Sequence, residues 1–444
     1  MKTMEAEVVI VGSGPGGATL ARELAGRGLR VLLIEKGSWP GATLGRYLSV
    51  GTITRIVLPR GRPGIMARGV CVGGTTMVFN GNAYDPPAWL KDELGIDLAP
   101  DVAAVRTELG IKPLPDDFFA HWPATGRLVE AAGKLGIILK PQDKYIDPDR
   151  CDPYCDDCNL GCRRGAKWTA REYVLEALDR GAGLLDRTTV SSIIIERGRA
   201  VGVLAQGPRG PILVRGEKVV LAAGGMGTPV ILMKSGVCGA GRGFFIDPMN
   251  VVWALSRHPV GRGEQTFSVA AEQYMAEDEF MIGNLGRLYL DPTSVLGWLR
   301  GYGFGHVMGM FAKMGDSAGG RINPRGRVHK PYSAQDLARF QKGTEICKRI
   351  MLEAGANPGT FLVLPNVGGH PGGTAAIGTV VDANLESLEI QDLYVCDASV
   401  FPRSPGRPPS LTIIALARRL ARYIEAESAQ APASPQKQAS NVIG

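Results

Sequence analysis

Four of the eight cysteines lie within twelve residues, at Cys151, Cys155, Cys158 and Cys162. Their C-x3-C-x2-C-x3-C spacing suits a four-iron four-sulfur ([4Fe-4S]) cluster, whose irons need thiolates wrapped around one compact body. Structural zinc usually takes two pairs of ligands separated by a longer loop, so zinc is a less favoured alternative. Disulfides are a third alternative, against which the absence of a signal peptide argues.

A glycine loop near the N-terminus has the spacing of a dinucleotide-binding turn. Gly12, Gly14 and Gly17 form G-x-G-x-x-G directly after the apolar run 8–11. In this pattern the first glycine allows a tight turn, the second lets the backbone approach a pyrophosphate, and the third lets helix and strand pack closely. Glu35 follows the next apolar run and is placed to accept hydrogen bonds from a ribose. The loop predicts an adenine dinucleotide but does not distinguish NAD from FAD.

Two further groups of residues could meet such a ligand. Gly73, Gly74 and Thr75, with Asn80 close behind, form a double glycine and hydroxyl pattern that suits a backbone passing near a planar or phosphorylated group. Towards the C-terminus, His370 stands in a Gly-His-Pro-Gly-Gly-Thr stretch. A histidine can act as a general base near neutral pH, although a lone histidine is more often structural.

The elements that must position these groups can be read from the apolar periodicity. We expect buried strands over 8–11, 30–34 and 219–221, a hairpin over 190–205, and helices over 18–27, 126–135, 169–180, 334–354 and 410–427. Residues 37–64 are rich in glycine and proline and are expected to be loop. Residues 246–332 alternate short strand-like runs with Gly and Pro, as an antiparallel sheet domain would.

Length and charge exclude several classes of protein. A chain of 444 residues is long for one core and predicts two interlocked domains. The net charge of +7 is scattered, so nucleic-acid binding is not expected. No apolar run reaches the roughly 20 residues that span a bilayer. We therefore expect a cytoplasmic protein.

Taken in order, these motifs resemble the glucose–methanol–choline (GMC) family of flavin oxidoreductases. The resemblance rests on the two glycine motifs with Glu35, on Ala222-Ala223-Gly224 followed by Thr228-Pro229, and on His370-Pro371, Asp397-Ala398-Ser399 and Ser410-Leu411-Thr412. It implies an α/β FAD-binding Rossmann-like domain and an α+β substrate domain built on an antiparallel sheet. It also implies non-covalently bound FAD.

The resemblance assigns roles residue by residue. The ADP part would be held by Gly12, Gly14, Gly17 and Glu35. The residues along the pyrophosphate and flavin would be Gly73, Gly74, Thr75 and Asn80. Val190 would touch the adenine by its backbone, and Ala223 and Asp397 would complete the binding site. His370 matches the catalytic histidine, which takes a hydroxyl proton while hydride leaves the carbinol carbon for flavin N5.

The same comparison suggests how the chain is divided. The expected segments are 1–140 (FAD domain, first part), 141–170 (cysteine-rich iron–sulfur segment), 171–245 (FAD domain, second part), 246–364 (substrate cap), 365–427 (FAD domain, C-terminal part with the histidine) and 428–444 (disordered tail). Some GMC-like dehydrogenases carry a comparable cysteine insertion before a Gly-Ala-Lys-Trp stretch.

One position departs from the family pattern. The family usually has a second His or Asn where this chain has Pro408, and proline has no side-chain donor or acceptor. Either another residue from 246–364 reaches the active site and shares the substrate hydroxyl with His370, or the chemistry is not ordinary alcohol oxidation.

Three functions are therefore weighed. The first is an FAD-dependent dehydrogenase of a CH–OH group, rather than an oxidase, that passes single electrons through the cluster to an external acceptor protein. The second is a reductase of a carbonyl or activated C=C bond that runs the other way. The third is a non-catalytic flavin electron-transfer subunit. The substrate and the oligomeric state are not predicted.

Overall fold

A parallel sheet carries the N-terminal glycine loop. In the computed structural model, which describes residues 1–41, 44–61, 64–155, 157–261, 263–286 and 304–430, β1 (Lys2–Val11) pairs with β2 (Val31–Ile34) and β12 (Gly210–Leu221). The strands β9 (Gly183–Leu185) and β21 (Leu393–Val395) extend it in parallel. The run 8–11 is fully buried, as expected for a strand covered on both faces.

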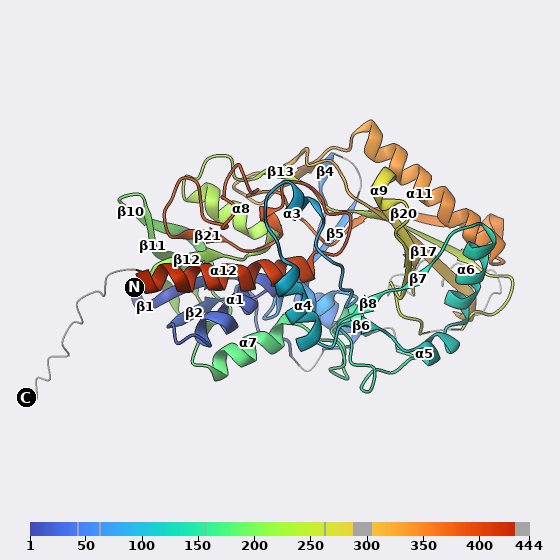
Figure 1. Cartoon of the computed structure of the whole chain (residues 1–444), viewed down its shortest axis with the longest axis horizontal. Coiled ribbons are helices and arrows are strands. Elements are labelled where there is room, and N and C mark those ends of the chain that lie inside the picture. The colour runs from blue at the N-terminus through green and yellow to red at the C-terminus, as the bar shows by residue number, and fades with distance from the viewer. Residues whose placement is uncertain (42–43, 62–63, 156, 262, 287–303, 431–444) are drawn as a thin grey trace, which may run out of the picture.

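Helices cover this sheet, and an antiparallel hairpin extends it. The helix α1 (Pro15–Ala25) packs on α7 (Ala170–Asp179) and on α12 (Ser410–Gln430), which crosses the domain in red in Figure 1. The predicted hairpin is confirmed as β10 (Thr189–Glu196) and β11 (Arg199–Gly207), and β11 pairs antiparallel with β12. The first domain is therefore the predicted α/β domain.

The second domain is built on an eight-stranded sheet with order β3-β5-β20-β14-β17-β16-β15-β7. Its strands are β3 (Thr54–Val57), β5 (Ile65–Gly69), β7 (Lys140–Pro141), β14 (Met249–Leu255), β15 (Val269–Ala271), β16 (Phe280–Asn284), β17 (Val307–Met314) and β20 (Leu362–Gly368). All pairs except β20 with β5 are antiparallel. The predicted antiparallel sheet domain is confirmed.

Two helices close one face of this sheet. The helix α11 (Ala334–Glu353) contacts β14, β16 and β17, and α6 (Pro123–Lys134) packs on α11 (Figure 1). Ser333 begins α11 with a capping box to Asp336, as its position before the helix predicts. Apolar side chains from α6, α11 and β14, among them Leu128, Phe340 and Val252, form one buried cluster. This cluster fixes the sheet on which part of the candidate site is built.

The expectation of a loop over 37–64 is wrong. This segment contains α2 (Tyr47–Ile53), β3 and β4 (Arg60–Gly61). Both strands are stabilised by pairing with distant elements: β5 joins β3 to β20, and β4 pairs with β19 (Val328–Lys330). The glycine and proline content of a segment does not predict which distant strands it will pair with. The sheet of the second domain thus takes strands from outside 246–364, and β20 continues past residue 364.

Smaller elements complete the chain. A four-stranded sheet joins β13 (Arg242–Phe244), β18 (Gly320–Ile322), β19 and β4, and β6 (Lys112–Pro113) pairs with β8 (Asp143–Lys144). Among the described residues, the remaining α-helices are α3 (Trp89–Asp92), α4 (Ala99–Glu108), α5 (Asp116–Ala120), α8 (Gly224–Lys234) and α9 (Met275–Asp278).

The predicted tail begins later than expected. The last helix runs through Gln430, so residues 428–430 are helical, and the rest of the predicted tail lies outside the described residues. Across the part of the chain that the structure describes, we find no helix with the length and apolar character needed to cross a membrane.

Candidate active site and cofactor cavity

A cavity of about 540 Å³ follows the C-terminal ends of the parallel strands. It is lined by nine of the twelve residues predicted for the cofactor and for catalysis: Gly12, Gly14, Glu35, Gly74, Thr75, Val190, Ala223, His370 and Asp397. Ligands of open α/β sheets bind at this edge, where loops from several strands converge. The structure thus gathers, at one cavity, residues that are hundreds of positions apart.

The two glycine motifs meet face to face. Gly74 has a φ of +57°, and a Cβ there would lie 2.9 Å from the Cα of Gly14. The N-terminus of α1 opens beside them and has no side-chain cap. Because free N–H groups and the helix dipole favour an anion, this is a suitable place for a pyrophosphate. The cradle therefore fits the ADP part of FAD.

Glu35 is buried at the end of β2. Its Oε2 accepts hydrogen bonds from the backbone N–H of Ser13 at 3.0 Å and from the Ser13 hydroxyl at 2.7 Å, and its Oε1 accepts from the Gly37 N–H at 2.7 Å. Burial raises the pKa of Glu35, although these three donors oppose the rise. The carboxylate therefore fixes the glycine loop as well as lining the cavity.

The other three predicted residues lie outside the cavity lining. Gly17 packs where a Cβ would meet the Gly12 carbonyl oxygen at 1.9 Å, so it serves close helix–strand packing. The Gly73 N–H donates to the Ser13 hydroxyl at 3.2 Å. The Asn80 carbonyl accepts from Lys144 Nζ at 3.2 Å. All three support the cavity wall from behind.

His370 also lines the cavity, as do Pro371 and Pro408. Its Nδ1 lies 2.8 Å from Oδ2 of Asp247, and the same carboxylate pairs with Lys313 Nζ at 2.6 Å. Burial and the charge of Lys313 lower the pKa of His370, while Asp247 opposes this. The imidazole is therefore neutral near pH 7 and can accept a proton.

The residue at position 408 offers no second polar group beside the histidine. Pro408 and Pro409 line the same cavity as His370, and Ser410, which begins α12, is the next hydroxyl along the chain in the lining. A residue from 246–364 contacts the histidine, but it does not line the cavity and so is not the second polar group expected to share a substrate hydroxyl; that expectation stays a prediction. That residue is Asp247, which contacts the Nδ1 side of the ring.

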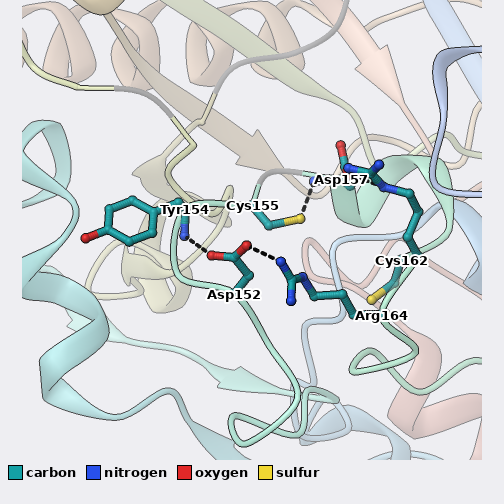
Figure 2. Close-up of a pocket in the computed structure, with 7 residues that line it drawn as sticks. Asp152, Tyr154, Cys155, Asp157, Cys162 and Arg164 are labelled. Carbon is teal, nitrogen blue, oxygen red and sulfur yellow. Dashed lines mark hydrogen bonds and ion pairs between the residues drawn. The ribbon is translucent and has the colours of Figure 1, made fainter.

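The cysteine segment forms a separate pocket of about 410 Å³ (Figure 2). Its lining includes Cys155 and Cys162, with the ion pairs Arg163–Asp157 at 2.8 Å and Arg164–Asp152 at 2.5 Å. These pairs leave little net positive charge at the pocket.

The thiols of the segment lie near one another. Burial raises the pKa of Cys151 to about 12, with smaller contributions from Cys158, Cys162 and Cys155. Gln265 Nε2 donates to Cys151 Sγ at 3.2 Å and so joins the segment to the second domain. Within the described residues, no group of three or more His, Cys, Asp or Glu side chains is arranged to hold a metal ion. The donor set suits an iron–sulfur cluster in type and number, but the structure does not show a formed site.

Two buried lysines separate the cysteine segment from the cofactor cavity. Lys167 Nζ donates to the carbonyl oxygens of Phe79 at 2.8 Å and Cys158 at 2.7 Å, and Phe79 lines the cavity. Lys144 Nζ donates to Asn82 Oδ1 and to the Thr266 carbonyl, both at 2.9 Å. Burial lowers the pKa of Lys144 to about 7 and of Lys167 to about 8, although nearby thiols oppose this. The segment therefore abuts the cavity wall.

Sequence reasoning missed three charged residues of the site. Asp247 and Lys313 support His370, and Arg68 lines the cavity near Gly74. Neither Asp247 nor Lys313 belongs to a motif, and Asp247 is 123 positions from His370. Arg68 directly precedes the second glycine motif, and its position there was the one available signal.

Comparison with known proteins agrees with this geometry. The family model described as GMC oxidoreductase matches residues 7–265 with its N-terminal part and 331–417 with its C-terminal part. An uncharacterized GMC-type oxidoreductase of Mycobacterium tuberculosis is 28% identical over 482 residues, which cover 94% of this chain and 75% of the relative. A long-chain-alcohol oxidase of Arabidopsis thaliana is 23% identical. That match covers 92% of this chain and 65% of the oxidase.

A solved structure shares the fold. The crystal structure of pyridoxine 4-oxidase from Mesorbium loti superposes with a TM-score of 0.72 at 21% identity, and the match covers 95% of this chain and 99% of that chain. The predicted fold class is thereby confirmed, and FAD is the cofactor of this fold family. Since the two family models together match well over half of the sequence, the chain belongs to the GMC oxidoreductase family.

Proposed function

We propose that this flavoprotein oxidises a CH–OH group, with His370 as the general base. The observation that carries the proposal is a neutral histidine at the cavity end, held at Nδ1 by Asp247 at 2.8 Å. Bound FAD would supply the two-electron acceptor for the hydride of the carbinol carbon. His370 would take the hydroxyl proton, and the cradle formed by Gly12, Gly14 and Glu35 would hold the ADP part.

The test is anaerobic reduction of the flavin by a panel of alcohols. The names of the relatives suggest pyridoxine and a long-chain alcohol such as 1-dodecanol, to which benzyl alcohol, a sugar and a sterol are added. His370→Ala should slow flavin reduction to a small residual rate while FAD stays bound. His329→Ala, on β19 and outside the cavity lining, is the matched control. Unchanged reduction in His370→Ala would exclude the histidine as the base.

We further propose that the cysteine segment holds a [4Fe-4S] cluster and that the enzyme is a dehydrogenase. Four thiols in twelve residues support the ligand set, and Lys167, which bridges Phe79 and Cys158, supports proximity to the flavin. A cluster there would carry single electrons to an acceptor protein in the cytoplasm. The long-chain-alcohol and pyridoxine enzymes that this chain resembles are named oxidases. Their names therefore do not support the dehydrogenase proposal, which rests on the cysteine segment.

Iron analysis of protein purified without oxygen tests the cluster. About four irons per chain are expected. Cys155→Ser should lower the iron content, whereas the exposed Cys238, far along the chain from the segment, provides a Cys238→Ser control that should not. Iron-free wild-type protein that contains zinc, or no metal, would contradict the proposal. Rapid reoxidation of the flavin by oxygen, rather than by a one-electron dye, would identify an oxidase.

The reverse reaction, reduction of a carbonyl or activated C=C bond, is a second candidate. It is favoured by Pro408, which offers no hydrogen bond to a substrate hydroxyl at the position where the family usually has His or Asn. Turnover with a reduced dye and a carbonyl compound, and none with an oxidised dye and an alcohol, would establish this direction. Because the cavity reaches His370, a non-catalytic electron-transfer subunit is not favoured.

A further inference from the structure

Asp247 is held in an unusual backbone conformation next to His370. Its φ is +56°, in the left-handed region that non-glycine residues rarely adopt. The backbone N–H groups of Ile246 and Asp247 both donate to the carboxylate of Asp316, at 3.1 and 2.8 Å. Asp316 in turn pairs with Lys330 at 2.9 Å. This strained conformation is thus fixed by a buried ion pair, which is typical of functional sites.

The side chain of Asp247 is fully buried and surrounded by donors. Its exposed fraction is 0%, and it accepts from Lys313 Nζ at 2.6 Å and from the Ser404 hydroxyl at 3.1 Å, besides facing His370 Nδ1. Although burial opposes it, the charge of Lys313 and the hydrogen bond with His370 keep the pKa of Asp247 below its usual value. The carboxylate is therefore ionised and can only accept hydrogen bonds.

An acceptor at this position determines which nitrogen of the histidine carries the proton. Nδ1 must donate to Asp247, so in the neutral ring the lone pair lies on Nε2. The His370 side chain keeps an exposed fraction of 26%, so the ring is not sealed off on its other side. Pro408 lines the same cavity but offers no hydrogen bond, so the polar support of the histidine among the described residues is Asp247 at Nδ1.

We infer that Asp247 is a positioning residue that holds His370 with Nε2 free to accept a proton, and that Lys313 keeps Asp247 ionised. When Nε2 takes the hydroxyl proton of the substrate, the imidazolium that forms is stabilised by the adjacent carboxylate. The inference rests on the proposed function, because it assumes that His370 is the base.

The tautomer can be measured without a substrate. The chain has five histidines, so ¹⁵N-histidine labelling of the flavoprotein gives few signals, and His370→Ala assigns the relevant one. We expect a neutral ring with the proton on Nδ1. The charged groups around it are Asp247, Lys313, Asp316 and Lys330. Asp247→Asn removes the only negative charge that touches His370 in the described structure, so the pKa of His370 should fall further and the Nδ1 preference should be lost.

A double-mutant cycle separates positioning from a general structural effect. With the fastest alcohol of the panel, Asp247→Asn should slow flavin reduction about 100-fold. In the His370→Ala background, Asp247→Asn should change the residual rate of flavin reduction less than twofold, because Asp247 acts on the reaction through the imidazole of His370. Asp101→Asn is the matched control: this buried carboxylate on α4 pairs with Arg422 at 2.6 Å and does not line the cavity.

Each outcome decides the inference. The Asp247→Asn protein could lose FAD because Lys313 is left unpaired. In that case the double variant Asp247→Asn/Lys313→Met is used instead, both for the ¹⁵N labelling and for the double-mutant cycle. A proton on Nε2 of His370 in the wild-type protein overturns the inference whether or not any variant folds. An equal slowing by Asp247→Asn with and without His370 also overturns it. A normal rate in His370→Ala, or no reduction by any alcohol, would instead overturn the proposed function, while the labelling experiment would still test the tautomer.

Discussion

Oδ2 of Asp397 accepts a hydrogen bond from the hydroxyl of Thr228 at 2.5 Å and another from the Gly224 N–H at 2.8 Å. Its Oδ1 accepts from the N–H and the hydroxyl of Ser399, at 2.8 and 2.6 Å. Although burial raises the pKa of Asp397, all four contacts are with donors. One carboxylate therefore ties the end of β21 to the start of α8 where both border the cavity.

Asp397→Asn should weaken FAD binding and lower the melting temperature. An amide nitrogen would face donors that now meet an oxygen, at a cost of about 1–3 kcal/mol. Thr228→Val should give a smaller loss in the same direction, and Thr228→Ser, which keeps the hydroxyl, should not. The measurement is the temperature at which flavin fluorescence rises on release. Equal release temperatures for Thr228→Val and Thr228→Ser would contradict this account.

Alanine substitutions at the cavity glycines Gly14 and Gly74 should distinguish backbone strain in the protein from contact with the ligand. A Cβ at Gly14 meets no protein atom within 4 Å, and its φ of −67° suits alanine. Gly14→Ala should therefore leave the apoprotein as stable as wild type but weaken FAD binding, because the new methyl group occupies the space of the phosphates. Gly74→Ala should also destabilise the apoprotein, by about 1–3 kcal/mol, since its φ is +57°.

Gly126→Ala, within α6 and with no atom near its added Cβ, is the control for these glycine variants. It should leave FAD binding unchanged. Fluorescence titration of apoprotein with FAD and thermal unfolding of apoprotein are both needed. Full FAD affinity in Gly14→Ala would show that the cofactor backbone does not pass this residue.

Arg68 is expected to bind an anionic part of the cofactor. Its guanidinium lines the cavity, its Nε has no hydrogen-bond partner, and it pairs with no carboxylate of the described residues. Burial and the nearby Arg55 lower the pKa of Arg68, so an anion would relieve an unfavourable charge. Arg68→Gln should weaken FAD binding at least 10-fold, with a reduced dependence on salt. Arg209→Gln, which removes an exposed charge in the turn before β12, should have no effect.

Glu264 should make stability fall as pH rises. It is buried and accepts from the Ala124 and Thr125 N–H groups at the start of α6, and burial raises its pKa to about 7. Between the usual pKa of about 4.3 and this value, the folded state holds a proton that the unfolded state has lost. The free energy of unfolding should therefore decrease by about 3 kcal/mol from pH 4.5 to pH 8 through this residue.

The melting temperature of Glu264→Gln, relative to wild type, should accordingly rise with pH over the same range. Glu130→Gln, at an exposed position of the same helix, should show a constant difference. A pH-independent difference between Glu264→Gln and wild type would show that Glu264 is ionised throughout.

The sequence by itself determined the features that are encoded within one stretch of chain. The Gly12–Gly17 loop, its flanking strands and the hairpin from 189 to 207 follow from local spacing, because backbone conformation and strand burial leave their own residue patterns. The motif around His370 was recognised through its resemblance to the GMC family. Composition also separated the cysteine segment from its surroundings, although it did not show a formed metal site.

Tertiary structure decided what lies next to these features. Strand β4 was expected to be loop because its sheet partner β19 is in a distant segment, and Asp247 carries no motif because its partner His370 is 123 positions away. Pairing and ion-pair contacts of this kind depend on how two domains close on each other. A residue pattern records the conformation of its own segment, but not which charge from another domain will face it.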